Sequence, residues 1–238
     1  MRRKEGLVLV EGIRAVGEAL DASASPRFAV VSPRLSDLTG GPSLRSRLGG
    51  LASLHVVGDS ELARLADTEH PQGVLAVFAE PDDPGLAKEA RYVILDGVQD
   101  PGNVGTIIRA AVGFGLDGVV ALEGTADPWG AKAVRASAGM AFRIPVTQCS
   151  WEEAREGLSR VGVGVIVGDA AGRDARSLAP PRTWALVVGS EGKGPRDSVR
   201  AAADQVLGIH LRGPAESLNV GVAAAVLMYA LTREDGVD

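Results

Sequence analysis

The sequence predicts an α/β protein of two units, a small α/β sandwich followed by a larger unit with a parallel sheet. Short apolar, strand-like runs alternate with segments of helical spacing, which is the pattern of α/β folds. The run Glu80-Pro-Asp-Asp-Pro-Gly85 interrupts this alternation with prolines, a glycine and acidic residues. We therefore expect a first domain over residues 1–80, a linker over residues 81–90 and a second domain over residues 91–238.

In the first unit, the apolar spacing predicts one helix and three strands, over Glu11–Ala22, Arg27–Val31, His55–Val57 and Gly73–Phe78. Asp59 and Ser60 are candidate N-caps of a further helix that runs to Ala66. Alternating short strands and helices are typical of a small α/β sandwich.

In the second unit, continuous apolar runs predict buried strands over Tyr92–Asp96, Gly118–Leu122, Val163–Val167, Trp184–Val188 and Val206–Ile209. Helical patterns lie between these runs, which indicates a parallel, doubly wound sheet. In such sheets ligands bind outside the carboxyl ends of the strands. Polar motifs at those positions are therefore candidates for a binding site.

Composition sets broad limits on the class of protein. The 238 residues, 45% of them hydrophobic, allow one large or two small cores. The single cysteine, Cys149, excludes an internal disulfide framework and suits a reducing compartment. No apolar run reaches the roughly 20 residues of a membrane span, and no signal-peptide core follows Met1. The expected location is the cytoplasm, with no membrane contact.

The net charge of −5 argues against bulk electrostatic binding to nucleic acid, because Lys and Arg supply most non-specific affinity for phosphates. Any RNA contact must therefore be local. The candidate basic clusters are Arg2, Arg3 and Lys4, then Arg45 and Arg47, then Lys132, Arg135 and Arg143. Each cluster on its own is better explained as an ordinary solvated face, because charged side chains are usually exposed.

The first polar motif, Asp96-Gly-Val-Gln-Asp-Pro-Gly-Asn-Val-Gly-Thr-Ile-Ile-Arg109, passes from a strand end through a Pro-Gly turn into a helix start. Asn103 is a candidate cap of that helix, and the first-turn amides suit an anion such as phosphate. Thr106 and Arg109 are three residues apart and share a helix face. Taken alone, the motif is also explained by a capped helix with a surface arginine.

The second motif, Gly189-Ser-Glu-Gly-Lys-Gly194, is a glycine-rich turn after a buried strand. A Walker loop would need Gly at position 187 and Ser or Thr at position 194, where this chain has Val187 and Gly194. This excludes a nucleotide-triphosphate loop, but the glycines still allow a ligand close to the backbone. Without the other motifs, Glu191 would be an exposed turn carboxylate.

The third motif, Glu216-Ser-Leu-Asn-Val220, enters an apolar segment that runs through Leu231. Ser217 or Asn219 is a candidate cap of the helix predicted there. This helix is apolar nearly all round, which predicts that it is buried.

In this order, the three motifs resemble those of the SpoU/TrmH branch of the SPOUT RNA methyltransferases. The resemblance implies methylation of an RNA ribose 2'-hydroxyl from S-adenosylmethionine by a homodimer. It also implies a deep trefoil knot within residues 91–238. Glu11-Gly12 and Pro71-Gln-Gly-Val-Leu-Ala76 look like the two ends of a substrate-binding domain that resembles a ribosomal-protein RNA-binding fold.

The resemblance favours ribosomal RNA of the large subunit, 23S RNA, as the substrate, including sites linked to antibiotic resistance. Transfer RNA is the alternative substrate, and a non-catalytic RNA-binding relative is the alternative function. A different small-molecule enzyme with a nucleotide pocket is disfavoured, because the chain has neither a Gly-x-Gly-x-x-Gly turn nor a Walker loop.

The resemblance also implies three sets of site residues. The catalytic set is Asn103, Arg109, Glu191, Ser217 and Asn219. The cofactor-binding set is Val188, Gly189, Glu191, Gly192, Ile209, Leu211, Ser217 and Leu218. The RNA-binding set is Arg109, Lys132 and Arg135.

Arg109 matches the family's catalytic arginine, but a guanidinium stays protonated and accepts protons poorly. We therefore expect it to hold a phosphate and stabilise alkoxide charge. Family geometry implies that it acts across the dimer.

Family members usually read Ile-Pro-Met where this chain has Ile209-His210-Leu211, which affects the rigidity of the loop and the shape near the methyl group. The histidines His55, His70 and His210 and the lone cysteine lack metal-ligand spacing, so no metal is expected. Trp129 is a candidate for base stacking, although packing is the favoured role.

Overall fold

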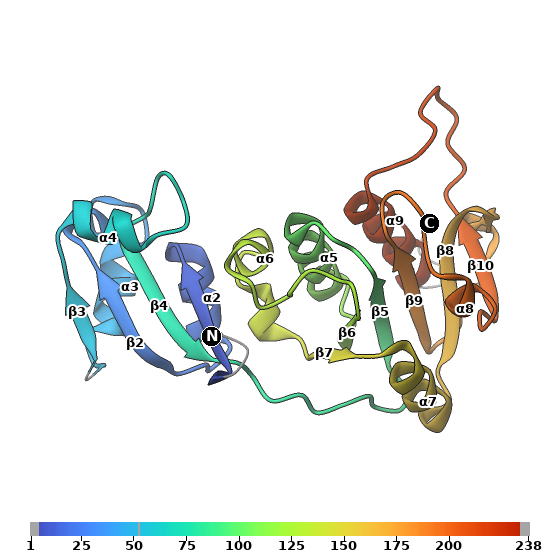
Figure 1. Ribbon diagram of the computed structural model, residues 1–238, viewed down its shortest axis with the longest axis horizontal. Helices are drawn as coiled ribbons and strands as arrows, with labels where there is room; N and C mark the ends of the chain where they lie inside the picture. The colour runs from blue at the N-terminus through green and yellow to red at the C-terminus, as the bar shows by residue number, and fades with distance from the viewer. Residues whose placement is uncertain (1–4, 52, 234–238) are drawn as a thin grey trace.

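The computed structural model describes residues 5–51 and 53–233, and its two sheets lie in separate parts of an elongated molecule (Figure 1). We call residues 5–79 the N-terminal part and residues 91–233 the C-terminal part. The segment between them, residues 80–90, contains no helix or strand. The basic cluster of Arg2, Arg3 and Lys4 lies outside the described residues.

The N-terminal part is built on a four-stranded sheet in the order β1-β4-β2-β3. Its strands are β1 (Leu7–Glu11), β4 (Val74–Ala79), β2 (Pro26–Val31) and β3 (Leu54–Val56). Strand β4 is antiparallel to β1 and β2, and β3 is parallel to β2. Alternate strand residues such as Val8, Val10 and Ala29 are buried with apolar residues of α2 (Ile13–Asp21) and α3 (Gly41–Leu48). The short helix η1 (Pro33–Asp37) and α4 (Asp59–Leu65) complete this part.

Two details of the N-terminal part differ from the sequence predictions. Glu11 is the last residue of β1, and the predicted helix begins only at Ile13. The five-residue strand β1 escaped prediction because it runs into the helix across a single residue, Gly12. Asp59 is the first residue of α4, whose N-cap is Gly58, so neither Asp59 nor Ser60 caps this helix.

The C-terminal part is built on a six-stranded sheet in the order β10-β8-β9-β5-β6-β7, in which every pair is parallel. The strands are β5 (Arg91–Asp96), β6 (Gly118–Leu122), β7 (Val146–Cys149), β8 (Gly164–Asp174), β9 (Trp184–Gly189) and β10 (Gln205–Gly208). The parallel α/β fold is therefore confirmed. The sequence missed β7, an edge strand whose Thr147 and Gln148 interrupt the apolar pattern.

Helices cover both faces of this sheet. One face packs against α5 (Pro101–Gly113), α6 (Ala131–Ala136) and α9 (Val220–Thr232), and the other against α7 (Trp151–Val161) and α8 (Asp197–Arg200). Alternate residues of β5 divide between the two cores: Val93 and Leu95 face one, Tyr92 and Ile94 the other. The short helices η2 (Met140–Arg143) and η3 (Ala175–Ser177) follow α6 and β8.

Helix α9 is not buried all round, which corrects the sequence prediction. Its inner face is buried, but Val222, Val226 and Tyr229 on the other face are 49%, 41% and 67% exposed. The ring of Tyr229 lies 6.0 Å from that of Phe114, the C-cap residue of α5. The amino-acid composition of this segment cannot distinguish a fully buried helix from a helix with one apolar stripe exposed at the surface. We call Val222, Val226 and Tyr229 the α9 stripe.

The two parts share a packed apolar contact. The ring of Phe78, from β4, lies 5.3 Å from that of Phe142, which in turn lies 5.4 Å from Trp129. Trp129 is 2% exposed, which agrees with the packing role favoured from the sequence. Gly139 touches α2 so closely that a Cβ atom would lie 2.7 Å from the carbonyl oxygen of Ala15. This edge of the junction is therefore tightly packed.

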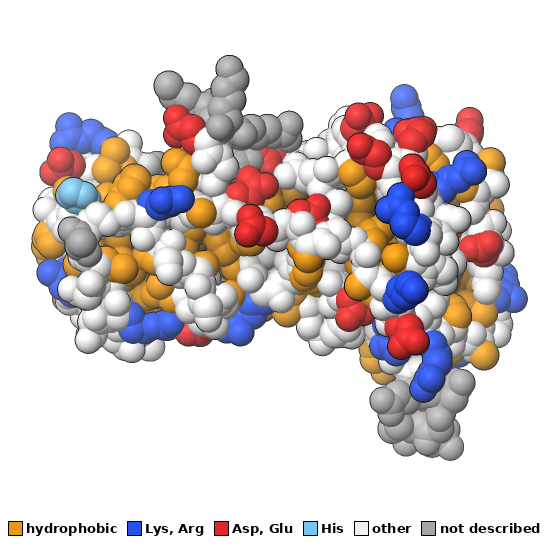
Figure 2. All heavy atoms as spheres, turned by 90° about the horizontal axis from the view of Figure 1, so that it is seen from below, with side chains coloured by type: hydrophobic (Ala, Val, Ile, Leu, Met, Phe, Trp, Pro, Cys, Tyr) orange, Lys and Arg blue, Asp and Glu red, His pale blue; other side chains and the backbone are white. Residues whose placement is uncertain are grey.

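The surface of the C-terminal part carries charges of both signs. Figure 2 shows Lys and Arg side chains interspersed with Asp and Glu on one face, while hydrophobic side chains gather over the N-terminal part. Across residues 5–51 and 53–233, no helix has the length and apolar character needed to cross a membrane.

Candidate functional site

The three polar motifs meet at one edge of the parallel sheet. The first follows β5 and the second follows β9, which pair side by side, and the third lies between β10 and α9. Because all strands are parallel, their carboxyl ends lie at the same edge. Motifs that are far apart in sequence are thereby brought together.

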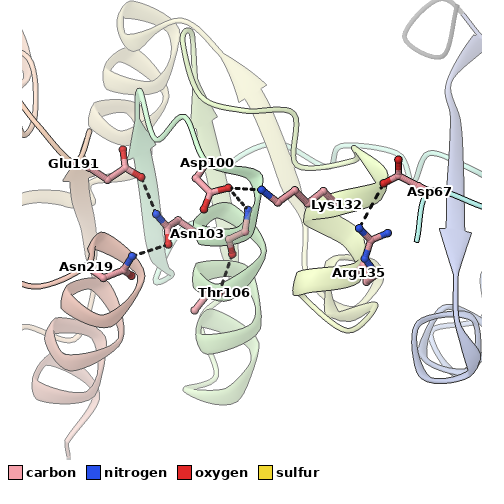
Figure 3. Close-up of polar contacts among 9 residues, drawn as sticks. Asp67, Asp100, Asn103, Thr106, Lys132, Arg135, Glu191 and Asn219 are labelled. Atoms are coloured by element: carbon pink, nitrogen blue, oxygen red, sulfur yellow. Dashed lines mark hydrogen bonds and ion pairs between the residues drawn. The ribbon is translucent and has the colours of Figure 1, made fainter. Parts of the chain in front are cut away.

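Asn103 connects the three motifs through its side-chain amide (Figure 3). Its Nδ2 donates a 2.7 Å hydrogen bond to Oε1 of Glu191, and its Oδ1 accepts a 3.0 Å hydrogen bond from Nδ2 of Asn219. One residue of each motif therefore takes part in a single network, which we call the amide bridge. Glu191 and Asn219 belong to the loops that follow β9 and β10.

Asn103 does not cap α5, contrary to the sequence prediction. The cap is Asp100, whose Oδ1 accepts a 3.0 Å hydrogen bond from the Gly102 amide. Both residue types favour N-caps, and Pro101 at the first helical position fixes the helix start after Asp100. The side chain of Asn103 is thereby free to form the amide bridge.

Lys132 binds the same capping carboxylate, with Nζ 2.9 Å from Oδ1 of Asp100. This bond and the Gly102 N–H bond lower the pKa of Asp100 below its usual value, with the Lys132 bond the larger cause. The Lys132 side chain is 60% exposed, and its predicted RNA contact stays a prediction.

Asn219 caps α9, as the sequence allowed. Its Oδ1 accepts hydrogen bonds from the amides of Gly221 and Val222 at 2.9 and 3.3 Å. Since its Nδ2 is bound to Asn103, the whole side-chain amide is used. Ser217, the other candidate cap, lies in the preceding loop and lines the cavity described next.

Strand β8, the loops after β9 and β10, and the start of α9 surround a cavity of about 710 Å³. All eight residues predicted to bind the cofactor line it: Val188, Gly189, Glu191, Gly192, Ile209, Leu211, Ser217 and Leu218. The volume is typical of small-molecule sites, which range over roughly 300–1,000 Å³. The structure thus gathers the predicted set around one space, while its role in cofactor binding stays a prediction.

The second motif is shaped by a close turn that requires glycine. A Cβ atom on Gly189 would lie 2.0 Å from the Gly194 carbonyl carbon, so a side chain there is excluded. The Gly194 amide donates a 2.9 Å hydrogen bond to the Ser190 carbonyl oxygen. Below the turn, buried Asp96 accepts bonds from Arg196 Nε at 2.6 Å and its amide at 2.7 Å. The end of β5 therefore anchors the exit of this loop.

Sequence reasoning missed two charged residues of the cavity wall. Asp169 of β8 and Arg200 of α8 both line the cavity and form an ion pair with each other. The Arg200 Nε also donates a 3.0 Å hydrogen bond to the Pro195 carbonyl oxygen. A polar residue shortly after the apolar run Val163–Val167 was the available signal for Asp169, since ligands bind at the carboxyl ends of strands.

His210 lies in the cavity wall at the position where the sequence departs from the family pattern. Its Nδ1 is 3.7 Å from Oδ2 of Asp174. The neighbouring Arg176 forms the stronger bond to this carboxylate, with Nη2 2.5 Å from Oδ2, and it is the main cause of the lowered pKa of Asp174. His210 is therefore a secondary partner of Asp174.

Arg109 lies away from the cavity of its own chain. It is exposed on α5 and does not line the cavity. Among the residues that the structure describes, its side chain has no hydrogen-bond or ion-pair partner. Thr106, one turn earlier, lies next to α9, where a Cβ atom on Gly221 would be 3.2 Å from its Cγ2. The catalytic role of Arg109 stays a prediction.

Arg135 binds acidic residues of the N-terminal part. Its Nη2 lies 3.4 Å from Oδ2 of Asp67, and its Nη1 lies 3.5 Å from Oε2 of Glu11. Its predicted contact with RNA is untested. Within the described part of the chain, no group of three or more His, Cys, Asp or Glu residues is placed to hold a metal ion.

Comparisons with known proteins match most of the chain. The model of the SpoU rRNA methylase family matches residues 90–229, and that of an MRM3-like substrate-binding domain matches residues 1–76. A 23S rRNA (guanosine(2553)-2'-O)-methyltransferase, RlmP of Bacillus subtilis, is 35% identical over 235 residues, which cover 97% of this chain and 90% of that protein.

Two solved structures have the same arrangement of elements. An RNA methyltransferase of the TrmH family from Porphyromonas gingivalis is 31% identical with a TM-score of 0.83, covering 97% of this chain and 91% of that one. An AdoMet-bound rRNA methyltransferase from Sinorhizobium meliloti is 28% identical with a TM-score of 0.81, covering 97% of this chain and 88% of that one.

Proposed function

The chain belongs to the SpoU RNA methylase family, and we propose that it transfers a methyl group from S-adenosylmethionine to a ribose 2'-hydroxyl of ribosomal RNA. The observation that carries this proposal is the amide bridge, which joins Asn103, Glu191 and Asn219 beside the 710 Å³ cavity. Three motifs of one family thus meet around a space suited to a small molecule.

The cavity fits S-adenosylmethionine in size and in the character of its walls. Its glycine-rich loops bring backbone groups to the surface, and the apolar residues Val188, Ile209 and Leu218 add dry contact area. Main-chain groups at Gly189, Ile209 and Leu218 would hold the adenosyl moiety. When bound, the cofactor supplies an electrophilic methyl group on a sulfonium. Glu191 and Asn219, joined by Asn103, would hold the loops after β9 and β10 in place and align the target ribose between them.

Arg109 acts electrostatically in this proposal. Because its guanidinium has no proton-accepting group, it would bind the phosphate beside the target ribose and stabilise the developing alkoxide. The proton would pass to water or to a neighbouring group. Since Arg109 does not line the cavity of its own chain, this role requires the pocket of a second copy.

The proposed assembly is therefore a homodimer. The α9 stripe, with Tyr229 at 67% exposure, supports an interface on the outer face of α9. The end of α5 lies beside it at Phe114, so an interface here would include the helix that carries Arg109. Such a dimer completes each site with a residue from the partner.

Three further expectations from the sequence belong to this proposal. Residues 1–80 are the RNA-binding substrate domain, residues 81–90 the linker and residues 91–238 the catalytic domain, as the family-model limits of 76 and 90 support. The C-terminal segment forms the trefoil knot, and the path from the edge strand β10 back to α9 beside α5 supports it. We also expect the protein in the cytoplasm.

Transfer of labelled methyl from S-adenosylmethionine tests the proposed function. Unmodified 23S ribosomal RNA, assembled large subunits and transfer RNA serve as parallel substrates, and the labelled product is identified by mass spectrometry of nucleosides. A labelled 2'-O-methylnucleoside from ribosomal RNA supports the proposal. Label in transfer RNA alone would assign transfer RNA, the alternative substrate. No transfer to any of the three RNA substrates, despite cofactor binding, would reject catalysis.

A further inference from the structure

The short helix α6 carries cations that face in two directions (Figure 3). Arg135 reaches Asp67 and Glu11 of the N-terminal part at 3.4 and 3.5 Å. Lys132, one turn earlier, reaches Asp100, the cap of the helix that carries Asn103 and Arg109. Helix α6 therefore contacts both the N-terminal part and the first motif of the catalytic site.

Glu11 is a fixed and almost fully buried carboxylate. Its side chain is 3% exposed, and it accepts a 3.2 Å hydrogen bond from the Asp67 amide and a further bond from the Thr68 hydroxyl. A buried charge is costly unless it is paired, and removing one partner of such a pair is strongly destabilising. Among the described residues, Arg135 is the cation in ion-pair contact with Glu11.

The rest of the junction is packed unevenly. One edge is tight, with Phe78 against Phe142, Gly139 against Ala15 and, beside them, Arg143 Nη2 2.7 Å from Oε2 of Glu18 in α2. The other edge is an open groove of about 490 Å³, whose walls come from Leu9 and Leu65 of the N-terminal part and from Pro101 and Lys132 of the C-terminal part. Among the described residues, the ion pairs of Arg135 with Glu11 and Asp67 therefore join the two parts beside this groove. Asp67, which also lines the groove, is one of the two carboxylates that Arg135 holds.

We propose that Arg135 is a positioning residue: by holding Glu11 and Asp67, it sets the tilt of the N-terminal part and so fixes which stretch of bound RNA reaches the cavity. This inference rests on the proposed function. Arg135 does not contact the RNA in this account. The ion pairs of Arg135 with Glu11 and Asp67 affect how productively RNA binds. Their loss leaves the cavity, the amide bridge and the methyl-transfer step unchanged.

The kinetic test uses Arg135→Ala and Glu11→Gln, which break the ion pair from opposite sides. Each is expected to raise the KM for RNA at least about fivefold, the lower end of typical coupling between sites, with kcat and the affinity for S-adenosylmethionine unchanged. The double variant is expected to resemble Arg135→Ala alone, because the two changes remove the same interaction. Arg135→Lys, which keeps a charge but not the forked geometry, is expected to restore part of the loss.

Glu11→Gln separates this account from direct RNA binding by Arg135. If the guanidinium contacted RNA, releasing it from Glu11 would leave the KM unchanged or lower it, and that result would overturn the positioning role. Arg160→Ala is the control, because the Arg160–Glu156 pair, with a 2.9 Å contact, lies within α7 and has side chains 70% and 76% exposed. This variant is expected to behave as the unmodified protein.

The tilt itself is measured by energy transfer between dyes on Ser43→Cys of α3 and Ser159→Cys of α7, in a Cys149→Ser background. Both serines are exposed, one in each part. Arg135→Ala is expected to broaden the distance distribution while the melting of far-ultraviolet circular dichroism stays cooperative. An unchanged distribution would contradict the proposal. This readout needs no RNA, so it remains decisive if the methyl-transfer assay fails and the proposed function falls.

Discussion

Asn103 donates a 2.7 Å hydrogen bond to Glu191 across 88 positions of sequence. Its remaining side-chain acceptor binds Asn219, so the orientation of the Asn103 amide is set from both sides. The bond requires a donor at position 103 and an acceptor at position 191. This gives the amide bridge a polarity that substitution can test.

Asn103→Asp is expected to lower kcat/KM by about tenfold to a hundredfold, because it replaces the donor with a second carboxylate facing Glu191. Addition of Glu191→Gln in the same chain supplies a donor again and is expected to recover part of the loss. Methyl transfer to RNA measures both variants. Additive losses in the double variant would show that the bridge does not act as a unit.

Arg109→Ala is expected to reduce turnover by about a hundredfold, the typical loss when one donor to a developing oxyanion is removed. The affinity for S-adenosylmethionine, measured by calorimetry, should not change, since the proposed partners of Arg109 are the RNA phosphate and the developing alkoxide and not the cofactor. If Arg109 acts across the dimer, mixed dimers with Asn219→Ala contain one intact composite site. Activity absent from both parents should then appear on co-expression, and its failure to appear would place Arg109 in its own chain's site.

Asp96→Asn is expected to lower the free energy of unfolding by about 2 kcal/mol, because Asp96 is buried and binds two groups of the partly exposed Arg196. For a chain of this size the melting temperature should fall by roughly 4–8 °C. Thermal denaturation with and without S-adenosylmethionine measures the effect. Asp82→Asn, an exposed carboxylate in the connecting segment, is the control and should melt as the unmodified protein.

Val226→Glu is expected to separate the proposed dimer into monomers, because it places a charge in the middle of the α9 stripe. Light scattering coupled to size exclusion measures the mass. Val56→Glu is a matched control, since Val56 is 59% exposed on β3 in the N-terminal part. A monomeric unmodified protein, or a Val226→Glu protein that stays dimeric, would exclude α9 as the interface.

Cys149 is expected to react slowly with iodoacetamide at neutral pH. Burial raises the pKa of its thiol to about 11, with smaller contributions from Glu153 and Asp83. Because the thiolate is the reactive form, the rate in the folded protein should rise about tenfold per pH unit towards pH 11. In the unfolded chain the reaction rate should level off about two pH units lower, near the ordinary pKa of a thiol. Equal pH profiles for the folded and unfolded chains would contradict this environment.

The sequence could predict those features that depend on local pattern. The buried strand β6 has the predicted bounds, Gly118–Leu122, because it lies inside the sheet and is apolar throughout. The edge strand β7 lacks that pattern and was missed. The eight predicted cofactor residues lie around one cavity because a parallel sheet places the ends of its strands together.

Side-chain partners were beyond local pattern. Asp100 and Asn103 both suit a helix N-cap, and only the position of Pro101 and the approach of Glu191 determine which residue caps α5 and which bridges. The pairing of Arg135 with Glu11 joins the two parts of the chain, so it depends on how those parts pack. A basic cluster in the sequence does not reveal that its side chains form ion pairs with carboxylates of the same chain.

Mapping of the methylated nucleotide tests whether this protein methylates a ribose 2'-hydroxyl of ribosomal RNA. Unmodified 23S ribosomal RNA, or the assembled subunit, is incubated with the protein and S-adenosylmethionine and then hydrolysed in alkali, which cannot cleave after a 2'-O-methylated ribose. We expect one newly protected position that requires the cofactor and forms far more slowly with Arg109→Ala. Methyl groups found on bases, or transfer without any protected position, would contradict this expectation.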